Sequence, residues 1–293
     1  MALAWLVPVL ILCSTGLVSA ATTLASPVAS LREKHASLEP AFRQNQFNQP
    51  LVIASVESRN RVQGDIYAVI RYPFAVVDTG LRNADHWCDV IFLHINTQYC
   101  HAQADPSGTT LKVNIGKKEF ENLADSARIE LSYRVAATTP DYFEVTLNAP
   151  DGPLGTSDYR IRLEAVALPD LQTFLHLSYS YTMSFAGRLA MQTYLGTIGR
   201  NKVGFTVTGT RTDGTADYIG GVRGLVERNT MRYYLAIDSF LEAFGALPEA
   251  RFEQRLHNWF TSVEHYPRQL HEMDREEYLG TKHAEDLRQR SVP

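Results

Sequence analysis

Histidine, cysteine and aspartate gather in one short window of the chain, where a metal site or a disulfide could form. The window contains His86, Cys88, Asp89, His94, Cys100 and His101. These side chains can bind zinc or copper, but their spacing matches no standard site. Two cysteines twelve residues apart are a candidate disulfide in an oxidising compartment if their Cα atoms come close. We therefore consider a Cys88–Cys100 disulfide with surface histidines, and expect no metal.

A second polar group falls on two neighbouring predicted strands. It consists of Arg160, Arg162, Glu164, His176 and Ser178. A histidine beside a carboxylate could act as a general base. Cross-strand pairing of charges on a wet sheet face explains the same residues without catalysis. The chain also has no nucleophile elbow and no nucleotide-binding fingerprint, so we assign no catalytic residue.

The stretch from Gly220 to Arg232 combines glycine with arginine. Its glycines allow the backbone to bend sharply or to approach another element closely. Arg223 and Arg228 come near the start of a predicted long helix, where positive charge opposes the helix dipole. We consider them a polar anchor for a carboxylate or an acidic head group. The structural alternative is an ion pair with Glu227 or Asp238.

The elements that would position these residues follow from the hydrophobic pattern. Alternation predicts a short strand at 51–56, a stronger one at 64–71, and six more between Val90 and Met183, the first of them over 90–101. Such clean alternation indicates an antiparallel sheet with one wet and one buried face. Helical spacing predicts two short helices after the strand at 64–71. Asn83 would cap the second helix, which carries Trp87.

Helical periodicity dominates the rest of the chain. We expect a helix from Phe185 to about Gly199, a hairpin around Asp213-Gly214, and a strong amphipathic helix from about Asn229 to Phe244. Another amphipathic helix begins at Pro248. After residue 267 the chain is dense in charge, which predicts a solvated or frayed helix.

The amino end has no charged residue before Arg32. An apolar run from Leu3 to Leu12, followed by Val18-Ser19-Ala20, is typical of a secretory signal peptide. We expect cleavage after Ala20 and a periplasmic or secreted protein. Since the first residues lack Lys and Arg, a signal anchor is the alternative. With 28 basic and 32 acidic residues, a net charge of −4 and no basic cluster, the chain has no feature that favours a nucleic acid partner.

The predicted order is a strand, two short helices, six antiparallel strands and a long helix. Over residues 64–244 this order resembles the START-like (SRPBCC) helix-grip superfamily, which includes Bet v 1-type and polyketide cyclase-like proteins. The local match is best at Gly64-Asp-Ile-Tyr-Ala-Val-Ile-Arg-Tyr-Pro-Phe-Ala-Val-Val, followed by Leu81 and His86-Trp87. The resemblance implies an α+β fold in an exported, bacterial-type member: a curved antiparallel sheet of about seven strands wrapped round the long C-terminal helix, with extra C-terminal helices.

Four parts of the chain follow from this reading. They are a signal peptide (1–20), a spacer (21–48) with a short helix near 31–38, a START-like ligand-binding domain (49–246) and a helical C-terminal extension (247–293). Residues 184–224 form an insert between the last strand and the long helix, where the superfamily has a short turn.

A helix-grip fold leaves a cavity between the sheet and the helix. The resemblance implies lipids, sterols or polyketide-like molecules as its contents, and no cofactor. We expect the lining to comprise Trp87, Tyr133, Tyr159, Tyr179, Tyr181, Met183, Met231 and Tyr234. A tyrosine offers a large apolar area and one hydroxyl that can orient a ligand. The alternative is that these tyrosines are ordinary core residues.

The sequence thus favours a carrier or sensor of an apolar small molecule over an enzyme. One alternative is a cyclase- or hydrolase-like enzyme that uses His176 or His94 with a carboxylate in the same cavity. Another is a structural envelope protein whose C-terminal helices, around Trp259 and Phe260, dock on a partner or a membrane surface.

Overall fold

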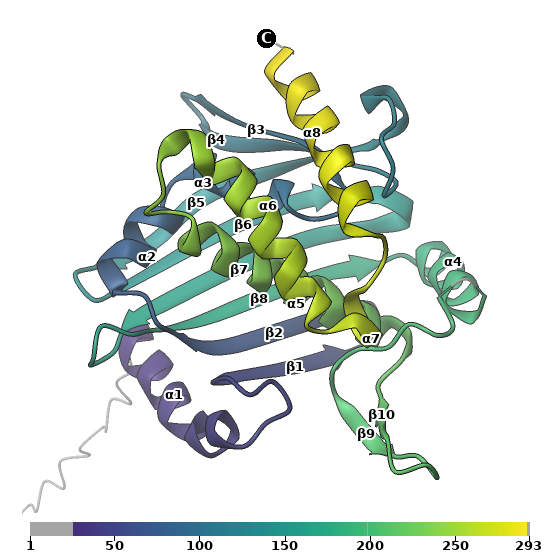
Figure 1. Cartoon of the computed structure of the whole chain (residues 1–293), viewed down its shortest axis with the longest axis horizontal. Helices are drawn as coiled ribbons and strands as arrows, with labels where there is room; N and C mark the ends of the chain where they lie inside the picture. The colour runs from purple at the N-terminus through teal and green to yellow at the C-terminus, as the bar shows by residue number, and fades with distance from the viewer. Residues whose placement is uncertain (1–25, 198, 292–293) are drawn as a thin grey trace, which may run out of the picture.

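An eight-stranded antiparallel sheet is the central element of the computed structural model, which describes residues 26–197 and 199–291 (Figure 1). Its strands are β1 (Leu51–Glu57), β2 (Arg61–Ile70), β3 (Thr97–Asp105), β4 (Gly108–Ile115), β5 (Ala127–Thr139), β6 (Tyr142–Asp151), β7 (Thr156–Ala167) and β8 (Thr173–Met183). The spatial order is β1-β2-β8-β7-β6-β5-β4-β3. Strands β3 to β8 therefore form a meander whose last strand pairs with the N-terminal hairpin β1-β2.

The long helix α5 (Gly221–Glu242) lies across one face of this sheet and contacts β1, β2 and β8 (Figure 1). Two short helices, α2 (Phe74–Leu81) and α3 (Ala84–Phe92), connect β2 to β3, and the Asn83 side chain caps α3 by accepting a hydrogen bond from the backbone N of Asp85. The predicted α+β helix-grip fold is confirmed. The sheet has eight strands rather than about seven, because β1 adds a strand beside β2.

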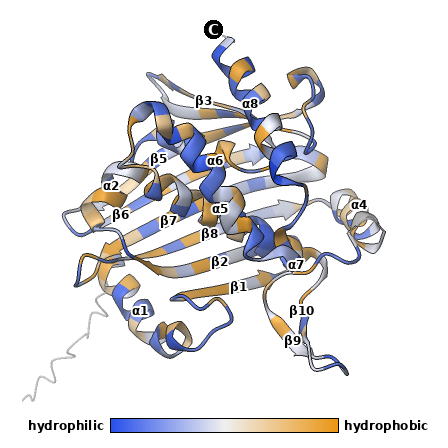
Figure 2. Cartoon of the chain, in the orientation of Figure 1, coloured by the Kyte–Doolittle hydropathy of each residue, from blue (hydrophilic) through white to orange (hydrophobic). Residues whose placement is uncertain are grey.

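Alternation along the strands separates the two faces of the sheet, as Figure 2 shows by its change between hydrophobic and hydrophilic residues. In β5, for example, Ile129 and Leu131 are buried while Glu130 and Ser132 are exposed. In β8 the buried residues facing α5 include Leu175, Leu177 and Tyr179. The core thus lies between the sheet and α5.

Two predicted boundaries are wrong. The strand expected from Val90 begins only at Thr97, because α3 extends to Phe92 and its buried apolar run has no clear period. The long helix begins at Gly221 rather than near Asn229. Its first turn passes close to another segment: a Cβ at Gly224 would lie 3.0 Å from the backbone N of Gly204.

The segment between β8 and α5 contains the helix α4 (Phe185–Gly196) and a hairpin of β9 (Val207–Thr210) and β10 (Ala216–Tyr218). Gly214 lies in the turn of this hairpin with a φ of 83°, a conformation that glycine adopts without strain. The predicted insert therefore has secondary structure of its own.

Three helices follow α5, namely α6 (Pro248–Glu264), α7 (Pro267–Leu270) and α8 (Arg275–Ser291). Helix α6 covers the outer side of α5, and this contact buries Trp259 and Phe260. The indole of Trp259 donates a hydrogen bond to the carbonyl of Arg232 (3.1 Å). These two aromatic residues are therefore buried inside the molecule and are not the exposed surface that the envelope-protein alternative would use.

The expectation of a solvated or frayed helix after residue 267 is also wrong. In α8, Tyr278, Lys282 and Glu285 are at most 1% exposed. The Lys282 ammonium donates to the carbonyls of His94 (3.0 Å) and Thr97 (2.6 Å).

Further along α8, the Arg288 guanidinium donates to the carbonyl of Gln98 (2.8 Å), and the side chain of Gln289 accepts from the backbone N of Cys100 (2.9 Å). Charged and amide side chains of α8 therefore bond the backbone of residues 97–100, at the start of the edge strand β3.

The range predicted as a spacer contains helix α1 (Pro27–Arg43), which spans the short helix expected near 31–38. Its Leu31 is buried with Tyr142, Val166 and Phe174, which belong to the sheet face opposite α5. The predicted signal peptide lies outside the described residues, and the domain boundaries stay predictions. Within residues 26–197 and 199–291, no helix has both the length and the apolar character that a membrane crossing needs.

Candidate functional site

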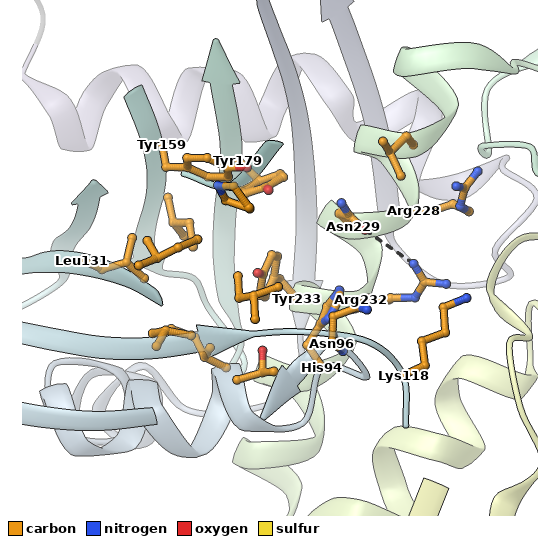
Figure 3. Close-up of a pocket in the computed structure, with 18 of the residues that line it drawn as sticks. His94, Asn96, Lys118, Leu131, Tyr159, Tyr179, Arg228, Asn229, Arg232 and Tyr233 are labelled. Carbon is orange, nitrogen blue, oxygen red and sulfur yellow. Dashed lines mark hydrogen bonds between the residues drawn. The ribbon is translucent and has the colours of Figure 1, made fainter. Parts of the chain in front are cut away.

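A cavity of about 260 Å³ lies between the inner face of the sheet and α5 (Figure 3). Its apolar wall comes from α3, β4, β5 and β7, and consists of Ile91, Val113, Ile115, Ile129, Leu131 and Ile161. Strand alternation turns the β-strand members of this set to the same face. Helix α5 forms the opposite wall with Leu225, Arg228, Asn229, Arg232 and Tyr233.

A second cavity of about 350 Å³ adjoins the first. The two share six lining residues, namely Asn96, Pro153, Tyr159, Tyr179, Leu225 and Asn229. The second cavity continues under α4, where Gly187, Ala190 and Met191 line it. Together the two cavities reach the size range of small-molecule sites, about 300–1,000 Å³.

Four tyrosine rings lie where the cavities adjoin. Tyr159 stacks on Tyr181 with ring centroids 5.2 Å apart, and Tyr179 lies 5.4 Å from Tyr233. The hydroxyls of Tyr159 and Thr156 are 2.9 Å apart and form a hydrogen bond. Burial raises the pKa of Tyr179, Tyr181 and Tyr233 above the ordinary phenol value. These phenols therefore stay neutral and can donate hydrogen bonds to a ligand.

Charged side chains form the other end of the first cavity. Glu272 pairs with Arg232 (Nη2 to Oε1, 2.9 Å), and its second oxygen accepts from the ammonium groups of Lys118 and Lys202. Burial alone would raise the pKa of Glu272, but the charge of Arg232 and the hydrogen bonds from the two lysines lower it to about 2. Arg228, 2% exposed, lines the same cavity. This end therefore combines several cations with one carboxylate.

His94 is buried in the cavity wall. Its Nδ1 accepts a hydrogen bond from the backbone N of Asn96 (3.2 Å). Burial, together with the charges of Arg232 and Lys282, holds the pKa of His94 well below its ordinary value. The ring is therefore neutral and carries its hydrogen on Nε2, near the Asn229 side chain. Within the described chain no carboxylate is bonded to His94, so the arrangement does not resemble an oriented general base.

His176 lies on the other face of the sheet, in a separate pocket beneath α1. Its Nδ1 is 3.1 Å from Glu164 Oε2, and its Nε2 is 2.9 Å from Asp65 Oδ1. The expected pairing across β7 and β8 is confirmed, since Glu164 and His176 are directly opposite. The expectation that His176 shares the cavity is wrong, because alternation points it away from Leu175 and Leu177.

Several residues that the sequence analysis assigned to the site do line it. Tyr159, Tyr179 and Arg228 line the first cavity, and Tyr181 lines the second. The others lie elsewhere, namely Trp87, Tyr133, Met183, Met231, Tyr234 and Arg223. Of these, Trp87 is a core residue that donates to the carbonyl of Leu81 (2.7 Å).

The arginines near the start of α5 differ from each other. Arg223 donates to the hydroxyl of Ser55 (3.0 Å) rather than facing the cavity. Glu227, the partner considered in the sequence analysis, accepts hydrogen bonds from Ser55 Oγ and from the backbone N of Phe205 and Thr206. It thereby holds the segment before β9 against α5.

Lys118 and Glu272 of this site were not predicted from the sequence. Lys118 follows β4, and Glu272 lies between α7 and α8, so no local pattern joins them. The aliphatic wall could be predicted from the sequence, because Val113, Ile129 and Leu131 belong to the apolar faces of predicted strands.

The disulfide considered in the sequence analysis is present. Cys88 of α3 and Cys100 of β3 are bonded, with Cα atoms 5.2 Å apart.

Comparisons with protein-family models and with curated proteins find no match. Solved structures with similarity include human StAR-related lipid transfer protein 5, with 10% identity and a TM-score of 0.32 over 59% of this chain and 89% of that one. Norcoclaurine synthase from Thalictrum flavum has 14% identity and a TM-score of 0.33, over 53% of this chain and 86% of that one. The Zhui aromatase/cyclase from Streptomyces sp. R1128 has 10% identity and a TM-score of 0.31, over 73% of this chain and 96% of that one.

At these identities and TM-scores, the similarities identify neither a ligand nor a reaction.

Proposed function

We propose that this helix-grip chain is an exported carrier or sensor that binds an apolar small molecule, such as a lipid, a sterol or a polyketide-like compound, between the sheet and α5. The observation that carries the proposal is the cavity with its aliphatic wall from β4, β5 and β7. Aliphatic side chains supply apolar contact area, and a few convergent polar groups can fix the orientation of a ligand.

The size of the cavity supports a binding role. Protein interiors leave few voids larger than a water molecule, and an unfilled apolar cavity lowers stability in proportion to its volume. A ligand that occupies the cavity would recover the lost contacts.

The chemistry of the site supports binding rather than catalysis. His94 is neutral, and its Nδ1 is already an acceptor for the backbone of Asn96. The carboxylate of Glu272 bonds to three cations and so is a weak base.

Export is supported by the uncharged apolar amino end and by the Cys88–Cys100 disulfide, which is the kind of cross-link that persists in oxidising compartments. Fractionation of producing cells tests the location. Mature protein beginning after Ala20 in the exported fraction is expected, and full-length protein in the cytoplasm would contradict export.

Native mass spectrometry, with organic extraction of the protein from its own compartment, tests the binding. A stoichiometric apolar molecule is expected. Leu131→Trp should abolish its retention by filling the cavity, while Glu130→Trp, the neighbouring residue on the exposed face of β5, should not. Circular dichroism should show both variants folded. Equal retention by the two folded variants would place the ligand elsewhere, and wild-type protein that binds no offered lipid or sterol would refute the proposal.

A further inference from the structure

We propose that the ligand is an anionic amphiphile, a molecule with an apolar chain and a terminal carboxylate or phosphate, and that its anion binds beside Arg228, Arg232 and Lys118. This inference rests on the proposed function of the same cavity and names the ligand class.

The cavity is polarised from one end to the other. In Figure 3, Leu131 of the apolar wall lies on one side, and Arg228, Arg232 and Lys118 lie together on the opposite side. Tyr159 and Tyr179 lie between the apolar side and the charged side of the cavity, at the border with the second cavity. A molecule that satisfies both ends must itself have an apolar part and a polar part.

The sign of the polar end follows from its ionisable groups. Among the described residues that line the first cavity, Lys118, Arg228 and Arg232 are cationic and only Glu272 is anionic. That carboxylate is shared with a further cation, Lys202. Among the groups that line this wall, cations therefore outnumber carboxylates.

Burial makes this excess chemically significant. Arg228 and Arg232 are 2% and 3% exposed, so bulk water screens their charges weakly. Guanidinium groups match the geometry of carboxylate and phosphate oxygens. These cations attract a ligand anion, whereas a neutral head group gains no such attraction and a cationic one is repelled.

His94 provides an independent indication. It is 6% exposed, and its nearest polar neighbour in the cavity wall is the side chain of Asn229. Because Nδ1 accepts from the backbone of Asn96, Nε2 carries the hydrogen and is a buried donor in the cavity wall. The side chain of Asn229, which faces both cavities, adds donors nearby. These donors suit an acceptor-rich head group.

Matched probes with the same chain and different heads test the inference on delipidated full mature protein by calorimetric titration. Dodecanoic acid and dodecyl phosphate should bind at least about tenfold more tightly than dodecanol, since hydrogen bonds to charged groups are the strong ones. Dodecyltrimethylammonium should bind most weakly. Inorganic phosphate alone should bind far more weakly than dodecyl phosphate.

Variants locate the head group. Arg228→Gln should lower the affinity for dodecanoic acid about tenfold and leave that for dodecanol unchanged. Lys118→Gln, at a half-exposed side chain that folding tolerates more easily, should give a smaller loss of the same kind. Arg128→Gln, on the exposed part of β5, is the matched control and should change neither affinity.

The outcomes separate the two proposals. Dodecanol binding as tightly as the acid would overturn the anionic head group and leave an apolar-ligand site standing. Inorganic phosphate binding as tightly as dodecyl phosphate would show an anion site without the chain, which also overturns the inference. Failure of every probe to bind would overturn the inference, and failure of the offered lipids and sterols as well would refute the proposed function itself.

Discussion

Thr230 of α5 packs directly on the backbone of Gly64 in β2. A Cβ added at Gly64 would overlap the Thr230 hydroxyl. That hydroxyl donates to the carbonyl of Val226 (2.7 Å), so it cannot rotate away without losing a hydrogen bond. The pair therefore fixes how closely the helix approaches the sheet, and so the height of the space between them.

Substituting Gly64 should destabilise the protein through this contact. We expect Gly64→Ala to lower the free energy of unfolding by about 1–3 kcal/mol, as overpacking does in cores. Thr230→Ala should relieve the overlap, so the double variant should lose less than the sum of the two single variants. Urea unfolding of the four proteins measures this coupling. Gly209→Ala, in open space on β9, is the control, and strictly additive losses would contradict the contact.

His176 should make stability depend on pH. Burial lowers its pKa, but hydrogen bonds and charges from Asp65 and Glu164 outweigh burial and raise it above 6.5. The contribution of His176 to the free energy of unfolding is then complete below pH 6.5 and is lost as pH rises through its folded-state pKa. The same contacts lower the pKa of Asp65 and Glu164 despite burial, so their contribution is lost as pH falls below their ordinary values of 3.8 and 4.5.

The comparison of wild type with His176→Gln isolates this effect. The difference in unfolding free energy should be largest between about pH 4.5 and 6.5 and should shrink as pH rises further. Urea titrations from acid to mildly alkaline pH measure it, with His257→Gln at an exposed position of α6 as the control. A difference that grew with rising pH would mean that His176 is neutral in the folded protein.

Asp238 on α5 should limit stability at neutral pH. Burial, with a smaller effect of the Glu242 charge, raises its pKa to about 6. Above that pH the folded chain must hold a charged carboxylate in a partly buried position, a cost that the unfolded chain avoids. Asp238→Asn should therefore raise the free energy of unfolding at pH 8 by about 1–2 kcal/mol, and this gain should vanish below pH 3.8. Thermal unfolding at the two pH values measures the gain, and an equal gain at both would exclude the charge as its cause.

The Cys88–Cys100 disulfide should stabilise the junction of α3 with β3. Its removal in a Cys88→Ala/Cys100→Ala variant should cost about 3 kcal/mol, the value for a closed loop of this order of length. Reductant should lower the denaturation midpoint of the wild type to that of the variant and leave the variant unchanged. If mass spectrometry shows complete reduction without any shift of the midpoint, the stabilising role is wrong.

The sheet was predictable because alternation reports directly on which face of a strand is buried. Ile129 and Leu131, for instance, alternate with exposed residues over the whole of β5. The start of β3 was not predictable in this way. Val90, Ile91 and Phe92 are all buried because α3 lies between the sheet and α5, so the helix shows an apolar run instead of a stripe.

The site was predictable only in part. Strand alternation pointed Tyr159 and Tyr179 to the inner face, where the cavity lies. Helix α5 is covered by the sheet on one side and by α6 on the other, so burial does not tell which of its residues face the cavity. The sequence therefore could not tell that Tyr233 lines the cavity while Met231 and Tyr234, which are also buried, do not. Lys118 and Glu272 meet only through the tertiary fold.

The side chains of α8 have a consequence for how this chain behaves among copies of itself. An edge strand with unbonded backbone groups is a template on which another chain can add a strand. At β3, Arg288 and Gln289 occupy the outward carbonyl of Gln98 and the outward N–H of Cys100, and Lys282 occupies the carbonyl of Thr97. Over residues 97–100 the helix α8 thus takes the place of a ninth strand, so that a strand of another chain cannot add there. The charged residues that suggested a solvated tail make this possible. Their long polar side chains reach the backbone of β3, while the helix itself has no free strand edge to which another strand could add.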